Sequence, residues 1–176
     1  MTERSIAVRD ITKIALMTAL TVVCSWITVP YTVPFTLQTF AVFFALEFAG
    51  GKNGGISYLI YIILGGIGVP VFSGFNGGVG HLFGPTGGYL FGFALSCVIF
   101  ILFENVLTRS RAIHASVLAF CLLSCYLCGT LWFSVYTGRA LLSSFVLCVL
   151  PYVVPDVLKI LLACYISYKL RKIINN

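Results

Sequence analysis

Charged side chains are scarce in this chain. Only 9% of its 176 residues are Asp, Glu, Lys or Arg, whereas 60% are hydrophobic, and the mean hydropathy is +1.05. A soluble globular domain carries about 25% charged residues, so this chain cannot cover a surface that faces water. The composition therefore predicts an integral membrane protein with about six spans of roughly 20 residues each.

Acidic residues and histidines are few, which removes several kinds of chemistry. The chain has five acidic residues and two histidines, and it contains no HExxH motif, no Walker-type phosphate loop and no plausible Ser-His-Asp order. His81 and His114 fall on opposite sides of the expected membrane topology, and His81 is expected at the surface or at a helix cap. We therefore expect no metal site, no cofactor and no enzymatic activity.

The seven cysteines all lie in apolar runs. Cys121, Cys125 and Cys128 share one helical face, at the spacing i, i+4, i+7, but no acidic residue or histidine accompanies them on that segment. A buried cysteine packs like a small hydrophobic residue. We expect these residues to pack in the protein interior, and we expect no disulfides.

Positive charge is in excess and has a regular distribution. The net charge is +6, and the basic side chains fall on alternate connections of a six-span path. These residues are Arg4, Arg9, Lys13, Lys52, Arg109, Arg111, Lys169, Arg171 and Lys172. Only Arg139 falls on the other side, so the positive-inside rule predicts that both termini are cytoplasmic. The charge thus indicates topology and not a nucleic-acid partner.

Six apolar segments are predicted to cross the membrane, and the second and third are shorter than a full crossing. The segments are residues 11–29, 37–49, 56–69, 89–103, 115–136 and 145–170. The loop after the first segment is stiffened by Pro30 and Pro34, residues 50–55 form a cytoplasmic turn, and residues 137–144 form an outer loop. We expect an all-α membrane bundle that forms a single substrate-binding domain over residues 1–176.

An acid and a base lie one helical turn apart in the last segment. Asp156 and Lys159, at the spacing i, i+3, share one helical face, in a region where each ionised group costs roughly 2.5–3.5 kcal/mol. Pro155 removes a backbone donor and loosens the turn before it, which suits a helix that lines a cavity. We expect a ligand pocket that opens outward. A pair that only holds helices together, or a lysine that extends to the membrane boundary, is the structural alternative.

A glycine-rich stretch, residues 72–88, precedes the fourth segment. Glycine permits close contact with a ligand, so this stretch is expected to form a close-packed lid, in which Asn76 supplies polar groups. Gln38 lies near the outer loop within reach of a ligand, and Glu47 is expected near the cytoplasmic end, facing water. Ala15 and Ala19, at the spacing i, i+4, form a face that another helix can approach closely.

Four segments together resemble the BioY biotin transporters, which are substrate-binding S components of energy-coupling factor (ECF) transporters. They are residues 33–40 (VPFTLQTF), 68–72 (GVPVF) and 84–90 (GPTGGYL), and the Asp156-x-x-Lys159 pair. They occur in order over nearly the whole chain, and the GPTGGY sequence is fairly specific. The family often has glycine where this chain has Pro155.

The resemblance implies a six-helix protein of the cytoplasmic membrane that binds biotin from outside. It implies two further kinds of partner, a coupling transmembrane protein and a pair of cytoplasmic ATPases, with Ala15 and Ala19 at the contact with the coupling protein. It also implicates Asp156 and Lys159 in biotin binding. Asp156 can accept from the ureido N–H groups of biotin, and Lys159 can donate to its carbonyl or its carboxylate.

The side chains expected to pack on the ring and aliphatic chain of biotin are aromatic: Phe72, Phe75 and Tyr89. Three other interpretations stay open at this point. The chain could be a membrane enzyme that uses Asp156 and Lys159 as acid and base on a lipid-like substrate. It could also be a structural subunit without a ligand, or a biotin facilitator that acts without ATPases.

Overall fold

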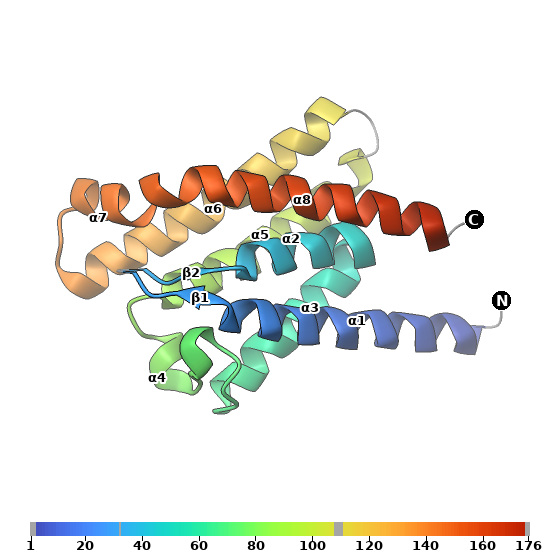
Figure 1. Ribbon diagram of the computed structural model, residues 1–176, viewed down its shortest axis with the longest axis horizontal. Helices are drawn as coiled ribbons and strands as arrows, with labels where there is room; N and C mark the ends of the chain where they lie inside the picture. Colours follow the sequence, from blue (N-terminus) through green and yellow to red (C-terminus); the bar gives the residue numbers. More distant parts are fainter. Residues whose placement is uncertain (1–2, 32, 108–110, 175–176) are drawn as a thin grey trace.

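The structure is a computed structural model that describes residues 3–31, 33–107 and 111–174; Arg109, one of the predicted cytoplasmic charges, lies outside them. Six longer helices in the described part correspond to the six predicted spans and run side by side (Figure 1). Their bounds are α1 Glu3–Trp26, α2 Gln38–Ala49, α3 Gly51–Gly66, α5 Gly87–Leu107, α6 Arg111–Thr137 and α8 Leu150–Ile174. The all-α membrane bundle predicted from the sequence is confirmed.

Short elements occupy the connections that were expected to be loops. Strands β1 (Thr28–Val29) and β2 (Phe35–Thr36) pair antiparallel and form a small hairpin between α1 and α2. The glycine-rich stretch contains the 3₁₀ turn η1 (Ser73–Phe75) and helix α4 (Val79–Leu82). Residues 141–144, predicted to lie in an outer loop, instead begin helix α7 (Leu141–Cys148).

The helices differ in how far they can reach across a membrane. Within the described residues, α5, α6 and α8 are long and apolar enough to cross by length and composition. Helix α2 has 12 residues and α3 has 16, so at 1.5 Å per residue they extend only about 18 Å and about 24 Å. Both are shorter than a hydrocarbon core of about 30 Å, as the short predicted spans indicated.

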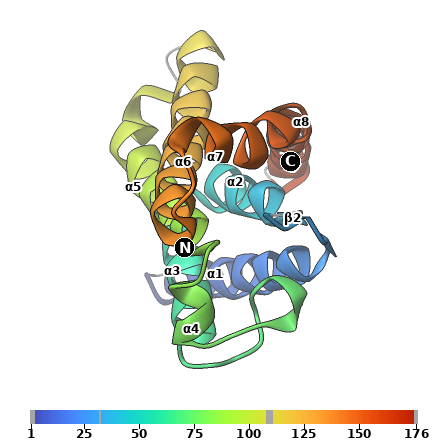
Figure 2. The ribbon, with the colours of Figure 1, turned by 90° about the vertical axis from the view of Figure 1, so that its left-hand side faces the viewer.

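Helix α2 lies near the middle of the bundle in the end-on view (Figure 2), and it packs mainly against α1, α3 and α8. All residues from position 41 to position 47 are buried. A helix that is apolar all round has no face for solvent and is stable only when it is enclosed. Glu47 lies within this run and is buried, not facing water as predicted, because the neighbouring helices surround the helix that carries it.

Helices α5 and α6 form the most extensive helix pair, and glycine makes their contact possible. A Cβ atom at Gly88 would lie 2.2 Å from Cβ of Trp132 and 2.8 Å from the backbone oxygen of Cys128. Cys121 and Cys125 on α6 are buried, and their thiols contact backbone oxygens of α5. All seven cysteines, which lie in the described part of the chain, are unpaired. Gly88 therefore serves the packing of α5 against α6.

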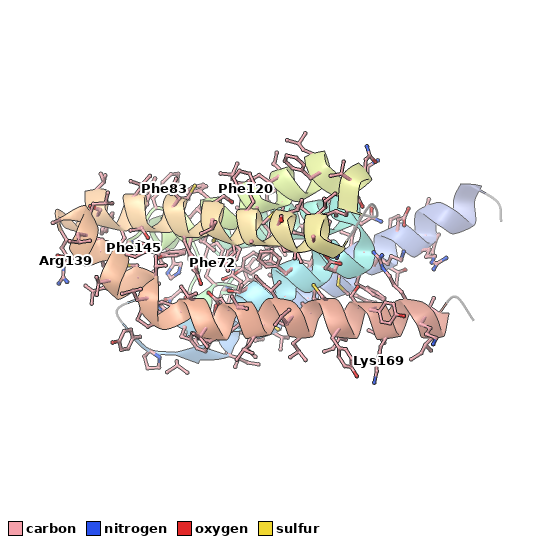
Figure 3. All side chains as sticks on the ribbon, turned by 90° about the horizontal axis from the view of Figure 1, so that it is seen from above. Phe72, Phe83, Phe120, Arg139, Phe145 and Lys169 are labelled. Carbon is pink, nitrogen blue, oxygen red and sulfur yellow. The ribbon has the colours of Figure 1, made fainter. Side chains whose placement is uncertain are left out.

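The two termini lie at the same end of the bundle (Figure 1). Arg9 and Lys13 of α1, Gly50 of the α2–α3 turn and Arg171 of α8 line one hollow there. The described structure places Arg139 at the other end of the bundle from Lys169 (Figure 3).

Gly88→Ala is expected to destabilise the protein by about 1–3 kcal/mol, because the added methyl group overpacks the α5–α6 contact. The measurement is thermal unfolding of the purified protein in detergent. Gly80→Ala is the matched control, since a Cβ at Gly80 meets no neighbouring atom of the described chain within 4 Å. Equal unfolding temperatures for the two variants would contradict the packing role of Gly88.

Candidate ligand-binding site

The acid and the base of α8 form a buried ion pair. Nζ of Lys159 lies 2.9 Å from Oδ1 of Asp156, and the two residues are only 7% and 6% exposed. The hydroxyl of Tyr126, on α6, donates to Oδ2 of Asp156 at 2.8 Å. Each carboxylate oxygen therefore has a partner, which offsets the cost of burying the charge.

The β-hairpin holds the ammonium group of Lys159 from the other side. Nζ donates to the backbone oxygen of Thr36 at 2.6 Å and lies 3.7 Å from the centre of the Phe35 ring. A cation over an aromatic face is attracted by the electron density of the ring. The hairpin that the sequence presented as a proline-stiffened loop is thus one wall of the site.

Asp156 and Lys159 line a cavity together with the hairpin, which lies at the end of the bundle away from the termini (Figure 1). Ligand pockets commonly combine apolar walls with a few polar groups. The lining residues are Val33, Pro34, Phe35, Thr36, Gln38, Thr39, Phe72, Ser73, His81, Thr86, Tyr89, Leu90, Phe93, Leu122, Cys125, Tyr126, Cys148, Tyr152, Asp156 and Lys159. The cavity has the mixed polar and apolar lining of a small-molecule site.

Gln38, the first residue of α2, presents an unused donor to this cavity. The residue is 6% exposed, and its side-chain Nε2 has no hydrogen-bond partner among the described residues. A buried polar group without a partner costs about 1–3 kcal/mol. A ligand with an acceptor atom would remove that cost.

Phe72 and Tyr89 are held by packing against their neighbours. Phe72 is fully buried; its ring stacks on that of His81, with 5.3 Å between the ring centres. A Cβ at Gly65 would lie 2.0 Å from the Phe72 ring, so only glycine leaves room for it. The Tyr89 hydroxyl donates to the backbone oxygen of Cys148 at 3.0 Å. Both aromatic rings therefore line the cavity in defined positions.

His81 lies half-buried in the last turn of the short helix α4, and its side chain also lines the cavity, which was not predicted. It precedes α5 in the glycine-rich stretch, and the turn of α4 brings its ring against Phe72. Burial lowers the pKa of the His81 imidazole below its usual value of 6.5. The ring is therefore neutral at pH 7, and it contributes a flat aromatic wall without charge.

The structure brings together most of the predicted site residues. Asp156, Lys159, Gln38, Tyr89 and Phe72 all line the one cavity.

Asn76 does not join them. It is exposed, is not among the lining residues, and donates from Nδ2 to the backbone oxygen of Ser73. The adjacent Phe75 is also exposed and stacks on Trp26, outside the cavity. The turn η1 directs both side chains away from the site.

Tyr126, Tyr152 and the Thr36 carbonyl were not predicted to belong to the site. Tyr152 donates to the backbone oxygen of Val33 at 2.5 Å, which fastens the hairpin to α8. The sequence contains only a weak indication: each tyrosine carries a hydroxyl group in an apolar helix, and a buried tyrosine hydroxyl usually has a hydrogen-bond partner. Only the packing of α6 and the hairpin against α8 identifies those partners.

A bundle of apolar helices around a cavity with a buried ion pair defines a membrane-embedded ligand-binding protein. The BioY family model matches residues 1–176, which is the whole chain. The chain therefore belongs to the BioY family.

Two named relatives align with this chain over nearly their full length. A "Probable biotin transporter BioY" of Pyrococcus horikoshii is 40% identical over 164 residues, covering 93% of this chain and 96% of the relative. The "Biotin transporter BioY" of Thermotoga maritima is 38% identical over 168 residues, covering 94% and 97%. A crystal structure of "the S-component for biotin from an ECF-type ABC transporter" matches with a TM-score of 0.87 and 29% identity, covering 98% of this chain and 95% of the other. The S-component bundle predicted from the sequence is thereby confirmed.

Lys159→Met is expected to lower the free energy of unfolding by about 3–5 kcal/mol, because it leaves the Asp156 carboxylate buried without its cation. The double variant Asp156→Asn with Lys159→Met removes both charges and should recover most of that loss. Thermal or denaturant unfolding in detergent measures both effects.

Lys169→Met is the matched control, since Lys169 is exposed on the same helix. If the double variant were no more stable than Lys159→Met alone, the two charges would not be coupled.

Proposed function

We propose that this chain captures biotin in the cavity beside Asp156 and Lys159. It would then be the substrate-binding component of biotin uptake by an ECF-type transporter, acting as a single domain over residues 1–176 and without a cofactor. The observation that carries the proposal is the buried ion pair in a cavity with polar and aromatic walls, in a chain that matches named biotin transporters over nearly their full length.

The polar groups of the cavity match those of biotin. The ureido ring of biotin has two N–H donors and a carbonyl acceptor, and its aliphatic chain ends in a carboxylate. Asp156 is the acceptor suited to the N–H groups, and Lys159 is a donor for the carbonyl or the carboxylate. The free Nε2 of Gln38 supplies a second donor for either acceptor. Hydrogen bonds that involve a charged group are the stronger kind in a site that excludes water.

The apolar part of biotin suits the aromatic walls. Phe72 is fully buried. Tyr89 lies on α5, and its hydroxyl donates a hydrogen bond to the backbone oxygen of Cys148. These rings offer flat apolar surface to the thioether ring and the aliphatic chain, and the hydrogen bond of Tyr89 keeps its ring in place. Asn76, predicted to add polar contacts, is left outside this arrangement by its exposed position.

An enzymatic role for the pair has less support. Both oxygens of Asp156 accept hydrogen bonds, from Lys159 and Tyr126, and Lys159 also donates to a backbone oxygen. This arrangement stabilises two fixed charges, which favours binding over proton transfer.

We further propose that uptake needs a coupling transmembrane protein and two cytoplasmic ATPases, since this sequence carries no nucleotide-binding motif. Ala15 and Ala19 are exposed on α1 and line an apolar groove between α1 and α3. Small residues on an exposed face let a partner helix approach closely.

The basic end of the bundle then faces the cytoplasm, in the cytoplasmic membrane, as the positive-inside rule requires.

Calorimetric titration of biotin into the purified protein in detergent is expected to show saturable binding to one site per chain. The double variant Asp156→Asn with Lys159→Met is expected to stay folded but loses the charged contacts, so its affinity should fall roughly 30- to 1,000-fold. Lys169→Met should bind like the unmodified protein. A flat trace with the unmodified protein, or normal affinity in the double variant, would contradict the proposal.

Ala15→Trp and Ala19→Trp are expected to leave biotin binding intact and to reduce cellular biotin uptake at least about tenfold, because a bulky side chain blocks close helix approach. Ala119→Trp is the matched control, an exposed alanine on α6 away from this face. The measurement is uptake of labelled biotin in cells with and without the coupling protein and ATPases. Full uptake without those partners would support a solitary facilitator instead.

A further inference from the structure

Three potential metal ligands from three different helices meet in the half of the bundle opposite the cavity. Glu47 lies near the end of α2, His114 near the start of α6 and Cys164 in the second half of α8. The carboxylate, imidazole and thiol donor atoms all lie within 4.8 Å of one another. Oε1 of Glu47 and Nε2 of His114 are 2.6 Å apart. The biotin proposal makes no use of this cluster.

We propose that Glu47, His114 and Cys164 bind a zinc ion. Zinc accepts carboxylate oxygen, imidazole nitrogen and thiolate sulfur together, and sites with three protein ligands leave the fourth position to water. With metal–ligand bonds of about 2.0–2.3 Å, tetrahedral donors lie about 3.4 Å apart. The Glu47–His114 pair, now 2.6 Å apart, would widen by less than 1 Å, and the more distant donor atoms, which all lie within 4.8 Å of one another, would move closer.

The charges of the cluster also suit a divalent cation. The Glu47 carboxylate and a Cys164 thiolate supply two negative charges, and the His114 imidazole binds metal in its neutral form. The complete site is therefore neutral, which reduces the cost of burial beside apolar helices. Arg171 donates from its guanidinium to the backbone oxygen of Glu47 and keeps its own charge at the edge of the cluster. A neutral zinc site adds no net charge beside the Arg171 guanidinium.

His114 gives the ion a route of entry. Its side chain is 31% exposed, whereas that of Glu47 is 11% exposed. The open position of the metal would thus lie on the His114 side, at the end of the bundle that carries the termini. Within the described residues, a hydrogen bond connects the side chains of Glu47 and His114. Bound zinc would connect both of them to Cys164 and so join α2, α6 and α8.

The test uses the full chain in detergent, with cobalt as a spectroscopic probe for the zinc site. One Co²⁺ per chain should bind and give a near-ultraviolet thiolate-to-cobalt absorption band, which zinc then abolishes by displacement. Binding should release protons, since the thiol must lose its proton. Cys164→Ser should eliminate the band, and His114→Gln should weaken cobalt binding at least about tenfold, because each variant removes one ligand.

Cys128→Ser is the matched control, because Cys128 is a half-buried cysteine outside the cluster. Its cobalt spectrum should equal that of the unmodified protein. No band in the unmodified protein, or a band that persists in Cys164→Ser, would overturn the zinc site. Thermal unfolding establishes that each variant is folded, and His114→Gln tests the site separately if Cys164→Ser is not. Biotin binding plays no part in this readout, so the two proposals can fail independently.

Discussion

Two opposite charges buried together on one helix set the main constraint on this structure. Asp156 and Lys159 are tolerable inside an apolar bundle only if their own charged atoms are hydrogen-bonded. The hydroxyl of Tyr126 on α6 donates a hydrogen bond to Asp156, and the carbonyl of Thr36 in the hairpin accepts one from Lys159. The ion pair thereby links three parts of the chain and fixes the polar side of the cavity.

The central helix α2 connects the two chemically distinct ends of the molecule. Gln38 at its start faces the cavity with a free donor, and Glu47 near its end meets His114. Residues 41–46 between them are apolar and buried. Because α2 has no solvent-facing side, each polar group on it must be satisfied by another helix or by a ligand. This is why both proposed sites include a residue of α2.

Much of the fold could be read from the sequence because a membrane imposes simple rules. Apolar length predicted the helices, and basic residues predicted that the termini share one end of the bundle. The i, i+3 pair in an apolar run pointed to the cavity directly. The short helix α7 and the strand pairing of Phe35 with Val29 were not predicted, since they depend on contacts between connections. Glu47 was misplaced because a carboxylate near a helix end usually faces water.

The sequence by itself determined the membrane class, the family and the two charges that mark the candidate site. These follow from composition, order and spacing, which are properties of the chain before it folds. The tertiary structure alone decided which groups surround those charges: Tyr126 on Asp156, His81 against Phe72, and Asn76 turned away. It also brought Glu47, His114 and Cys164 together from three helices. Their separation along the chain carries no periodic signal, because helix packing and not local spacing creates the contact.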